Sequence, residues 1–490
     1  MTARINRLMA RLGTPVAIAA GALVLRLICG VGFANYDTFY ALAWGGQLSR
    51  GQTPAYGVPI APTPHPLIEA LGLILSPLSP RTIENLVVAL GFLALAGCGW
   101  VIYRLGTEWF GRAVGALAVL ILLTRGEVLS YGTRAYIDIP YLLLVLSALL
   151  VETRRRRAGA PVLILLALAG LLRPEAWAFS GLYWLYLVGW VPRRLRSDQL
   201  DYKPPRAPAE LAWLAVLGVS APAIWIASDW LITGHPLWSL TNTRHTAETL
   251  DRVSGITNVP EYIPRRIGSI LGPPALVGAV LGGVLSLAWL RERARLGAIV
   301  GVVAVLVFAA FATVGLPINT RYAFLASAIL AVFAGAGVFG WTALKPEDRR
   351  RRWWMVGSLV VLVAMIAYLP SQYRSAHRQM QSLARQQRIQ NELLGLVGQR
   401  AITLRCGPVE VTNHAPIPLL ALYLKASPAL VPSAQSHPPI ASGTYVEPAD
   451  KEVEEDYILD PHDPPPREVS IPPGFQASKT SRSWLIFEKC

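Results

Sequence analysis

Long apolar segments recur along the whole chain, and each is close to the length of a membrane-spanning helix. A helix that crosses the hydrocarbon core of a bilayer needs about 20 predominantly apolar residues. The chain offers about eleven such segments by this criterion: 13–33, 82–103, 112–125, 136–152, 160–172, 177–191, 210–230, 270–290, 296–314, 322–342 and 353–370. The pattern therefore predicts an all-α polytopic membrane domain over residues 1–370.

Basic residues gather at alternate ends of these segments. The short cytoplasmic loops of membrane proteins carry an excess of lysine and arginine, so this alternation sets the orientation. Basic residues precede the first span and follow each even-numbered one: Arg4, Arg7, Arg11, Arg104, Arg112, residues 154–157, Arg193, Arg194, Arg196, Arg291, Arg293, Arg295, Lys345 and residues 349–352. We therefore expect a multi-pass plasma-membrane protein with a cytoplasmic N-terminus and with everything after Pro370 outside the cytoplasm.

The composition agrees with a membrane protein and excludes another class. Hydrophobic residues make up 53% of the chain and charged residues only 15%, which is far from the balance of a soluble domain. The formal charge of +15 does not indicate nucleic-acid binding, because the excess comes from the cytoplasmic loops. The basic N-terminal stretch leads into a long apolar segment without a small-residue cleavage site, which indicates a retained helix and not a signal peptide.

Three segments expected outside the cytoplasm are long enough to carry function. The first, 34–81, begins with a helical hydrophobic period at residues 35–44, which predicts an amphipathic helix lying along the membrane interface. The second is 231–268. The third is the tail, 371–490, in which residues 374–399 and 418–424 resemble helices and residues 409–413 and 483–487 resemble strands. We expect a small extracytoplasmic α/β domain in this tail, with a partly disordered Pro- and acid-rich section at 445–473.

The four cysteines fall into two environments. Cys29 and Cys98 lie inside apolar segments and are expected to be inert packing residues. Cys406 and Cys490 both lie in the tail, where the expected compartment allows disulfides to persist. A Cys406–Cys490 disulfide is one expectation, and two free thiols are the alternative.

The first outer segment carries a distinctive arrangement of residues. Arg26 and Leu27 near the end of the first span are followed by Asp37, Tyr40, Ala43, Leu48, Gly51, Pro54, Tyr56 and the run His65, Pro66, Leu67. This arrangement resembles the first external loop of the GT-C glycosyltransferases, the polyprenyl-phosphate-sugar-dependent enzymes that include protein O-mannosyltransferases and lipid A aminoarabinose transferases. In that family, an acidic residue at this position is the catalytic base or orients the acceptor. From its position alone, Asp37 also fits a polar or capping residue of an interfacial helix.

Shorter motifs extend the resemblance over roughly residues 10–370. Residues 133–140 enter the fourth span as a second acidic motif of the family does, with Asp138 matching the acid. Residues 172–175 (Leu-Arg-Pro-Glu) lie where the family has a basic residue at an outer helix end, and residues 319–322 (Asn-Thr-Arg-Tyr) are similar to its Arg-Tyr motif. The resemblance implies the GT-C fold.

The resemblance also implies an inverting single displacement and roles for the residues that match. Asp37 would be the base, with Asp138 supporting it, although a carboxyl with an ordinary pKa of about 3.9 needs burial or a neighbouring acid to be an effective base. Arg173 and Arg321, with Arg134 as a third candidate, would hold the donor phosphate, because a guanidinium can bind two oxygens and stays charged. The alternative for these arginines is snorkelling or a structural ion pair, such as Arg173 with Glu175 or Asp138.

Other polar residues near these motifs are candidates for substrate binding: Tyr40, His65, Glu69, Glu175, His235, Arg244 and Tyr322. A lone histidine in an outer loop is also ordinary polar surface, and solvation alone is enough to explain Asp229. Asp37 is followed by Thr38, where many relatives have a second acid, which favours a metal-independent mechanism. We expect no cofactor, with a divalent metal as the open alternative; a zinc site made of His65, His235, His245 and Asp37 lacks ligand spacing.

These expectations combine into one function. The protein would transfer a single sugar, mannose or arabinofuranose, from a polyprenyl-phosphate donor in the lipid bilayer to an extracytoplasmic glycan, glycolipid or protein acceptor. The alternatives are a lipid or glycolipid transporter or flippase, a scaffold whose tail binds partners, and a ligase of the same fold that moves a preassembled glycan. A transporter would show repeated halves with broken helices, and no internal repeat is visible in the sequence.

Overall fold

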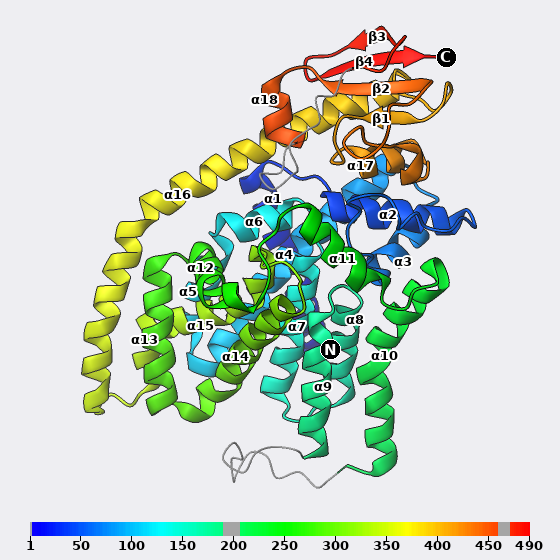
Figure 1. Cartoon of the computed structure of the whole chain (residues 1–490). Helices are drawn as coiled ribbons and strands as arrows, with labels where there is room; N and C mark the ends of the chain where they lie inside the picture. The colour runs from blue at the N-terminus through cyan, green and yellow to red at the C-terminus, as the bar shows by residue number, and fades with distance from the viewer. Residues whose placement is uncertain (1, 190–205, 459–470) are drawn as a thin grey trace.

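The computed structural model describes residues 2–189, 206–458 and 471–490. Most of these residues form a bundle of helices, and a small sheet with its own helices lies at one end of the bundle (Figure 1). The bundle consists of α1 (Thr2–Cys29), α4 (Pro80–Phe110), α5 (Arg112–Leu123), α6 (Gly126–Thr133), α7 (Asp138–Arg154), α8 (Ala160–Gly170), α9 (Glu175–Val188), α10 (Pro208–Thr233), α11 (Trp238–Thr249), α12 (Val259–Leu271), α13 (Pro273–Trp289), α14 (Arg291–Thr313), α15 (Phe324–Phe339) and α16 (Arg349–Gly398).

Each apolar segment predicted as a span coincides with one of these helices. Five of the described helical segments are long and apolar enough to cross a membrane, and the number is seven if each of two bent pairs is one span. One bend lies between α5 and α6 (69°), and the other lies between the segment Ile256–Leu271, which ends with α12, and α13 (104°). Segments 13–29, 66–75 and 160–170 are shorter apolar helices. The chain is therefore a multi-pass membrane protein.

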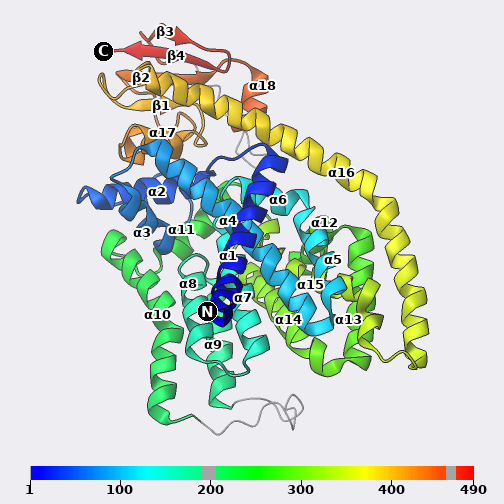
Figure 2. The same cartoon turned by 180° about the vertical axis from the view of Figure 1, so that it is seen from behind.

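The basic loops lie together at the end of the bundle that is opposite the sheet. The start of α10, the turn between α13 and α14 and the start of α16 all lie at the lower end in Figure 1, and the sheet lies at the upper end. The same distribution is visible from behind (Figure 2). The predicted basic positions Arg193, Arg194 and Arg196, and the side chains of Arg4, Arg7 and Arg11, lie outside the described residues.

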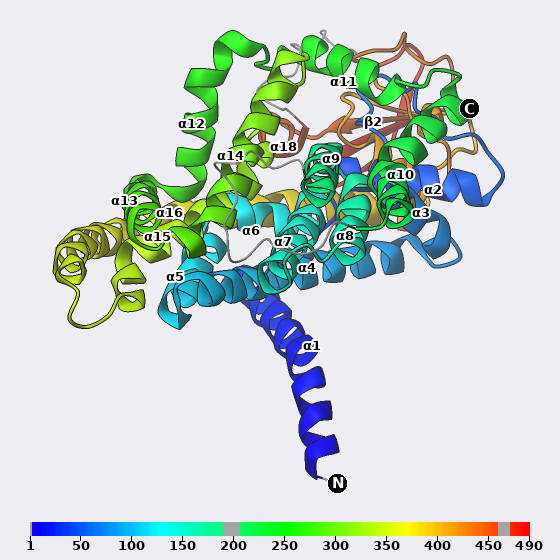
Figure 3. The ribbon, with the colours of Figure 1, turned by 90° about the horizontal axis from the view of Figure 1, so that it is seen from below.

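The helices pack around α15, which is buried along almost its whole length. Its closest neighbour is α13: a Cβ on Gly282 would overlap the backbone at Phe333 and Gly337, so the two helix backbones touch. Small residues allow this approach in membrane helices, where close van der Waals packing is a main source of stability. Seen from below, α1 projects away from the rest of the bundle (Figure 3).

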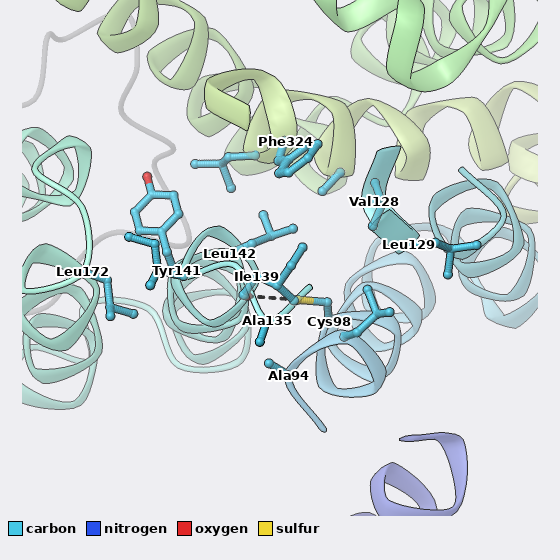
Figure 4. Close-up of a cluster of buried hydrophobic side chains, with 14 of the residues drawn as sticks. Ala94, Cys98, Val128, Leu129, Ala135, Ile139, Tyr141, Leu142, Leu172 and Phe324 are labelled. Carbon is cyan, nitrogen blue, oxygen red and sulfur yellow. Dashed lines mark hydrogen bonds between the residues drawn. The ribbon is translucent and has the colours of Figure 1, made fainter. Parts of the chain in front are cut away.

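The apolar core continues between α4, α6, α7 and α15. Cys98 from α4 donates to the Ile139 carbonyl of α7 at 3.6 Å, and Phe324 at the start of α15 lies in the same cluster (Figure 4). Both Cys98 and Cys29 are buried free thiols, as their apolar surroundings predict. This core supports the first turns of α7 and α15, next to which the candidate site lies.

The helix predicted along the membrane interface is instead buried. This helix, α2 (Tyr36–Ser49), is buried at residues 38–47, over nearly three turns and on every face. It packs between α3 (Pro66–Leu75) and α17 (Ile417–Tyr423). A Cβ on Gly45 would overlap the backbone of Glu69, Gly72 and Leu73, so α2 and α3 cross at direct backbone contact. The prediction of an amphipathic helix with an exposed face was therefore wrong, because the tail covers the face that was expected to meet solvent. Its position along the membrane interface stays a prediction.

The tail begins inside α16, which runs without interruption through residue 371, the predicted domain boundary. Beyond it, a four-stranded sheet has the order β1-β2-β4-β3, with β1 parallel to β2 and the other pairs antiparallel. The strands are β1 (Val409–Val411), β2 (Gly443–Pro448), β3 (Gln476–Thr480) and β4 (Trp484–Lys489). The two strands and the short helix predicted in this region are present as β1, β4 and α17. Cys406 and Cys490 form a disulfide that joins the segment before β1 to the end of β4.

Buried polar contacts hold the tail against the bundle. The carboxylate of Glu84, at the start of α4, accepts hydrogen bonds from Gln390 of α16 (3.1 Å) and from the Tyr423 hydroxyl of α17. Gln47 of α2 donates to Ser427 after α17 at 3.2 Å. These contacts place the tail directly over α2.

Candidate active site

A cavity of about 790 Å³ lies at the end of the bundle that the tail covers. Its wall includes the start of α2, the loop before α3, the first turns of α9, parts of α10, α11 and α14, and the short helix η3 (Thr320–Ala323). The wall includes apolar residues: Trp225, Ile226, Leu240, Phe311 and Leu316. It also includes charged residues: Asp37, Arg173, Glu175, Asp229, Arg252, Arg266 and Arg321.

Asp37 and Arg321 form an ion pair on the cavity wall. Asn35 caps α2 by accepting a hydrogen bond from the Thr38 backbone amide (3.2 Å), which places Asp37 in the first helical turn, where a carboxylate interacts well with the helix dipole. Arg321 donates to the Asp37 carboxylate at 2.7 Å, and the two side chains are 21% and 14% exposed. Burial alone would raise the pKa of Asp37, but the cation and hydrogen bond of Arg321 bring this pKa below its ordinary value.

Arg173 is held between two acids beside this pair. Its guanidinium contacts the Asp138 carboxylate and binds Glu175 through two nitrogens, at 2.6 and 3.0 Å. It also lies over the Tyr322 ring, with its central carbon 4.4 Å from the ring centroid. All three charged side chains are less than 10% exposed. Two guanidinium groups, those of Arg173 and Arg321, therefore face three carboxylates in this part of the site.

His65 is a neutral side chain on the same wall. Burial lowers its pKa to about 3, with the two nearby arginines acting in the same direction against the opposing effect of Asp37. Its ring meets Trp225 edge to face at 5.8 Å. Behind it, Glu69 accepts hydrogen bonds from the His65 backbone amide (3.0 Å) and the Tyr56 hydroxyl (2.5 Å). Burial raises the pKa of Glu69 to about 7.

Several polar atoms of the site lack hydrogen-bond partners within the described part of the chain. They are all buried: His65 Nδ1, Asp138 Oδ2, Glu175 Oε2 and Arg321 Nε. Buried polar atoms are almost always satisfied in native proteins, and those that are not commonly mark functional positions. The four atoms come from four separate segments of sequence, and they gather around one cavity.

Six of the predicted site residues line the cavity: Asp37, His65, Arg173, Glu175, Arg321 and Tyr322. Asp138 lies directly behind Arg173, to which it is bonded. Five others are not on the cavity wall: Tyr40, Glu69, Arg134, His235 and Arg244.

The five residues away from the cavity have other surroundings. Tyr40 is fully buried between the rings of Tyr36 and Trp44, and Glu69 lies beneath His65. Arg134 is over the Tyr136 ring, at 4.9 Å, and donates to Ser130. His235 is exposed, and Arg244 donates to the Val314 carbonyl.

The structure also brings in residues that the sequence did not single out. Asp229, predicted to be a solvated residue, is 2% exposed. Its carboxylate accepts hydrogen bonds from the backbone amide and from the hydroxyl of Ser239, each at 2.8 Å. That prediction was wrong because α11 folds back over the end of α10, so that Asp229 caps the first turn of α11. Arg252, Arg266 and His414 line the cavity as well. A charge in an outer segment was the only sequence signal for the two arginines, and His414 had none.

Within the described part of the chain, the residues that line the cavity form no cluster of potential metal ligands. Among the described residues, the one group of three potential ligands with suitable spacing is Cys406, Glu488 and Cys490, and its two cysteines are joined in a disulfide. The residues considered for zinc, His65, His235, His245 and Asp37, are not brought together within the described structure.

Comparison with known proteins places the fold. No protein-family model matches the chain, and no curated protein matches it in sequence. The crystal structure of ArnT from Cupriavidus metallidurans bound to undecaprenyl phosphate aligns over 97% of this chain and 98% of its own, with a TM-score of 0.56 and 14% identity. The apo form of that protein aligns over 98% of both chains, with a TM-score of 0.54 and 14% identity. The chain has the GT-C fold.

This result confirms the fold that the sequence resemblance implied. The archaeal oligosaccharyltransferase AglB from Archaeoglobus fulgidus, in complex with an inhibitory peptide and a dolichol-phosphate, is more distant, with a TM-score of 0.48 and 11% identity over 92% of this chain and 70% of its own. At these identities the likeness concerns the fold, and the chemistry has to be argued from the residues of this chain.

Proposed function

We propose that the protein is a membrane glycosyltransferase that transfers a single sugar from a polyprenyl-phosphate donor to an acceptor outside the cytoplasm. The observation that carries the proposal is the Asp37–Arg321 pair on a cavity lined by both apolar and charged residues within a GT-C fold. The sugar is mannose or arabinofuranose, and the acceptor is a cell-envelope glycan, glycolipid or protein. In the proposed topology, eleven spans place the N-terminus in the cytoplasm and residues 371–490 outside.

The two kinds of residue in the cavity wall suit the two parts of such a donor. The isoprenoid would lie against the apolar residues, among them Trp225, Ile226 and Phe311, since burial of apolar surface favours binding. The phosphate would lie toward the arginines. A similar fold in ArnT, which was crystallised with undecaprenyl phosphate, supports this class of donor.

We assign the phosphate to Arg321, Arg252 and Arg266, all of which line the cavity. Arg173 is a weaker candidate than its position suggests. The carboxylates of Asp138 and Glu175 together carry more negative charge than its guanidinium carries positive charge. A phosphate placed on Arg173 would meet two carboxylates at short range, and like charges repel strongly in a buried site. Arg173 is better suited to positioning Tyr322, against whose ring it packs.

Asp37 would act as the general base, and Arg321 would control when it does so. While paired with Arg321, Asp37 has a lowered pKa and is a weak base. A donor phosphate that takes the cation of Arg321 would leave burial as the dominant influence and add a negative charge nearby, and both effects raise a carboxyl pKa. Arrival of the donor would therefore prepare Asp37 to accept a proton.

The proposed reaction is a single displacement without a metal. The acceptor oxygen forms a bond to the anomeric carbon, its proton passes to Asp37, and the bond from that carbon to the phosphate oxygen breaks with its electrons leaving on the phosphate. The arginines stabilise the charge that develops on the leaving phosphate. Attack opposite to the leaving group inverts the anomeric centre.

The test measures sugar transfer by membranes that contain the protein. Radiolabelled polyprenyl-phosphate mannose and polyprenyl-phosphate arabinose are supplied separately to wild type, to Asp37→Asn and to the matched control Asp251→Asn, which changes an exposed acid in an outer segment. Wild type and Asp251→Asn should transfer one of the two sugars, and Asp37→Asn should lose roughly 100-fold or more of the rate, as expected for a general base.

Two results would count against the proposal. If wild type consumes neither donor, the donor class is wrong. If Asp37→Asn transfers as fast as the control, the reaction class stands and Asp37 is not the base.

A further inference from the structure

A buried arginine outside the cavity has no role in the chemistry proposed above. Arg125 joins α5 to α6 and is only 8% exposed, and it does not line the cavity. Its side chain makes one hydrogen bond within the described part of the chain, from Nε to the Ile121 carbonyl at 2.8 Å. No carboxylate of the described residues pairs with it. The positive charge of this guanidinium is therefore not balanced by an acid.

The protein compensates this charge only in part. Transfer of an ion out of water is strongly unfavourable unless an opposite charge replaces the solvent. A Cβ on Gly272, which follows the last residue of α12, would lie 3.5 Å from Nη1 of Arg125. The end of α12 therefore lies beside the guanidinium, and a helix C-terminus carries about half a negative charge. Neither terminal nitrogen of Arg125 has a hydrogen-bond partner among the described residues.

The neighbours of Arg125 place it at the membrane surface on the side of the tail. Gln372 of α16 donates to the Thr124 hydroxyl at 2.9 Å, and Gln372 follows directly on the apolar stretch of α16 that ends at Pro370. The helix α6 contacts both α12 and α16, and the three lie on the same side of the bundle (Figure 2). Arg125 therefore lies where apolar residues give way to polar ones, which is the level of the lipid headgroups.

The charges on α16 favour a headgroup with a net negative charge. Between residues 371 and 391 this helix has no acid and five basic or histidine residues: Arg374, His377, Arg378, Arg385 and Arg388. Arg374 and Arg378 are exposed on the turns next to Gln372. Glu127, the acid in the first turn of α6, forms no ion pair with Arg125 in the described structure. Basic residues at a membrane surface attract anionic lipids.

We propose that Arg125 binds the phosphate of an anionic phospholipid whose headgroup lies between α6, α16 and the bend from α12 to α13. A guanidinium can bind two phosphate oxygens at once and stays charged. A headgroup such as that of phosphatidylglycerol adds no cation of its own, whereas the choline of phosphatidylcholine would be repelled by the basic residues of α16. The site lies apart from the cavity, so this inference does not depend on the proposed reaction.

Two variants separate lipid binding from a structural role. Arg125→Gln removes the charge, and Arg125→Lys keeps the charge but loses the planar fork that binds two oxygens. The matched control is Arg265→Gln, which removes the charge of an exposed arginine on α12. Because the charge of Arg125 lacks an acidic partner in the lipid-free protein, Arg125→Gln should be at least as stable as wild type without lipid.

The experiment uses purified full-length protein that has been delipidated in a neutral detergent. Its unfolding temperature is recorded during titration with dioctanoyl-phosphatidylglycerol. Wild type and Arg265→Gln should show a saturable rise, since a ligand that binds only the folded state stabilises it. The apparent Kd should be about tenfold or more higher in Arg125→Gln, as expected for lost charge-assisted hydrogen bonds, and intermediate in Arg125→Lys. Dioctanoyl-phosphatidylcholine and inorganic phosphate should raise the unfolding temperature of wild type much less at the same concentrations.

Four results would overturn the proposal. An unchanged Kd in Arg125→Gln would show that Arg125 does not bind the lipid. An equal response of wild type to phosphatidylcholine would show that the charge of the headgroup is not recognised, and an equal response to inorganic phosphate would indicate a site for a free anion. An Arg125→Gln protein that fails to fold, or that is clearly less stable than wild type without lipid, would assign Arg125 a structural role at the end of α12.

Discussion

Two buried carboxyl groups near the cavity, those of Asp37 and Glu69, have pKa values displaced in opposite directions. Burial favours the neutral form of both. Asp37 has a guanidinium at 2.7 Å that reverses this effect, whereas Glu69 has a tyrosine hydroxyl and a backbone amide as its hydrogen-bond donors. The nature of the partner therefore decides whether the pKa of a buried carboxyl falls, as for Asp37, or rises, as for Glu69.

This difference predicts a specific dependence of stability on pH. The pKa of Glu69 is raised from 4.5 to about 7 in the folded protein, so between these values the folded state holds a proton that the unfolded state has lost. Stability should therefore fall as the pH rises from about 4.5 to 7 and stay level above it, by an amount on the order of 3 kcal/mol. The unfolding temperature of purified wild type at pH 5 and pH 8 should show the decrease, and Glu69→Gln should show little of it. The exposed control Glu248→Gln should retain the decrease, and equal slopes in all three proteins would contradict the assignment.

At the scale of secondary structure, the crossing of α2 and α3 positions the candidate base. The backbones touch where Gly45 meets residues 69–73, and Asp37 lies two turns earlier on α2. A side chain at this crossing would push the helices apart and move Asp37 relative to Arg321.

Gly45→Ala should therefore reduce both stability and transfer. Alanine favours a helix over glycine by about 1 kcal/mol, but its Cβ would overlap the backbone of Glu69, and overpacking costs about 1–3 kcal/mol or more. We expect a lower unfolding temperature and a clear loss of sugar transfer in the radiolabel assay. Gly57→Ala is the control, because a Cβ there has no atom within 4 Å. A Gly45→Ala protein as stable and active as the control would contradict this prediction. It would show that α2 and α3 can move apart at their crossing without disturbing the site.

At the scale of the whole molecule, the cavity and the basic loops lie at opposite ends. The positive-inside rule assigns the basic end to the cytoplasm, so the cavity and the tail should face the outside. The disulfide between Cys406 and Cys490 agrees with that compartment.

Cysteine labelling tests this orientation. In a background of Cys29→Ser and Cys98→Ser, the disulfide leaves no other free thiol. A membrane-impermeant maleimide should label Ser436→Cys, an exposed position in the tail, in intact cells. It should label Glu292→Cys, an exposed position in the basic first turn of α14, only after permeabilisation. The reverse pattern would invert the topology and move the proposed reaction into the cytoplasm.

Much of the fold was accessible from the sequence because it depends on local patterns. Each predicted span is a helix, and β1, β4 and α17 lie where alternation and turn residues predicted them. The wrong predictions concern what surrounds a residue or helix in the folded protein. Asp229 and the helix α2 were expected to meet solvent or the membrane interface, and both are buried because a segment far away in the sequence folds over them.

The candidate site shows the same division. Motif resemblance led to Asp37, Asp138, Arg173 and Arg321 individually, but it did not reveal that Arg173 is matched by two acids or that Arg252, Arg266 and His414 join the cavity. Charge balance and hydrogen bonding depend on distances between side chains, and no sequence pattern encodes those distances.

By itself, the sequence determined the class of the protein, its helices, its expected orientation and the GT-C resemblance. Hydropathy and loop charge are local properties of each segment, so they can be read without knowing its tertiary contacts. Only the tertiary structure decided which charges meet. Asp37 and Arg321 are 284 positions apart, and His414 comes from the tail. Helix packing brings these side chains together, and burial then fixes their protonation, which turns separate polar residues into one site.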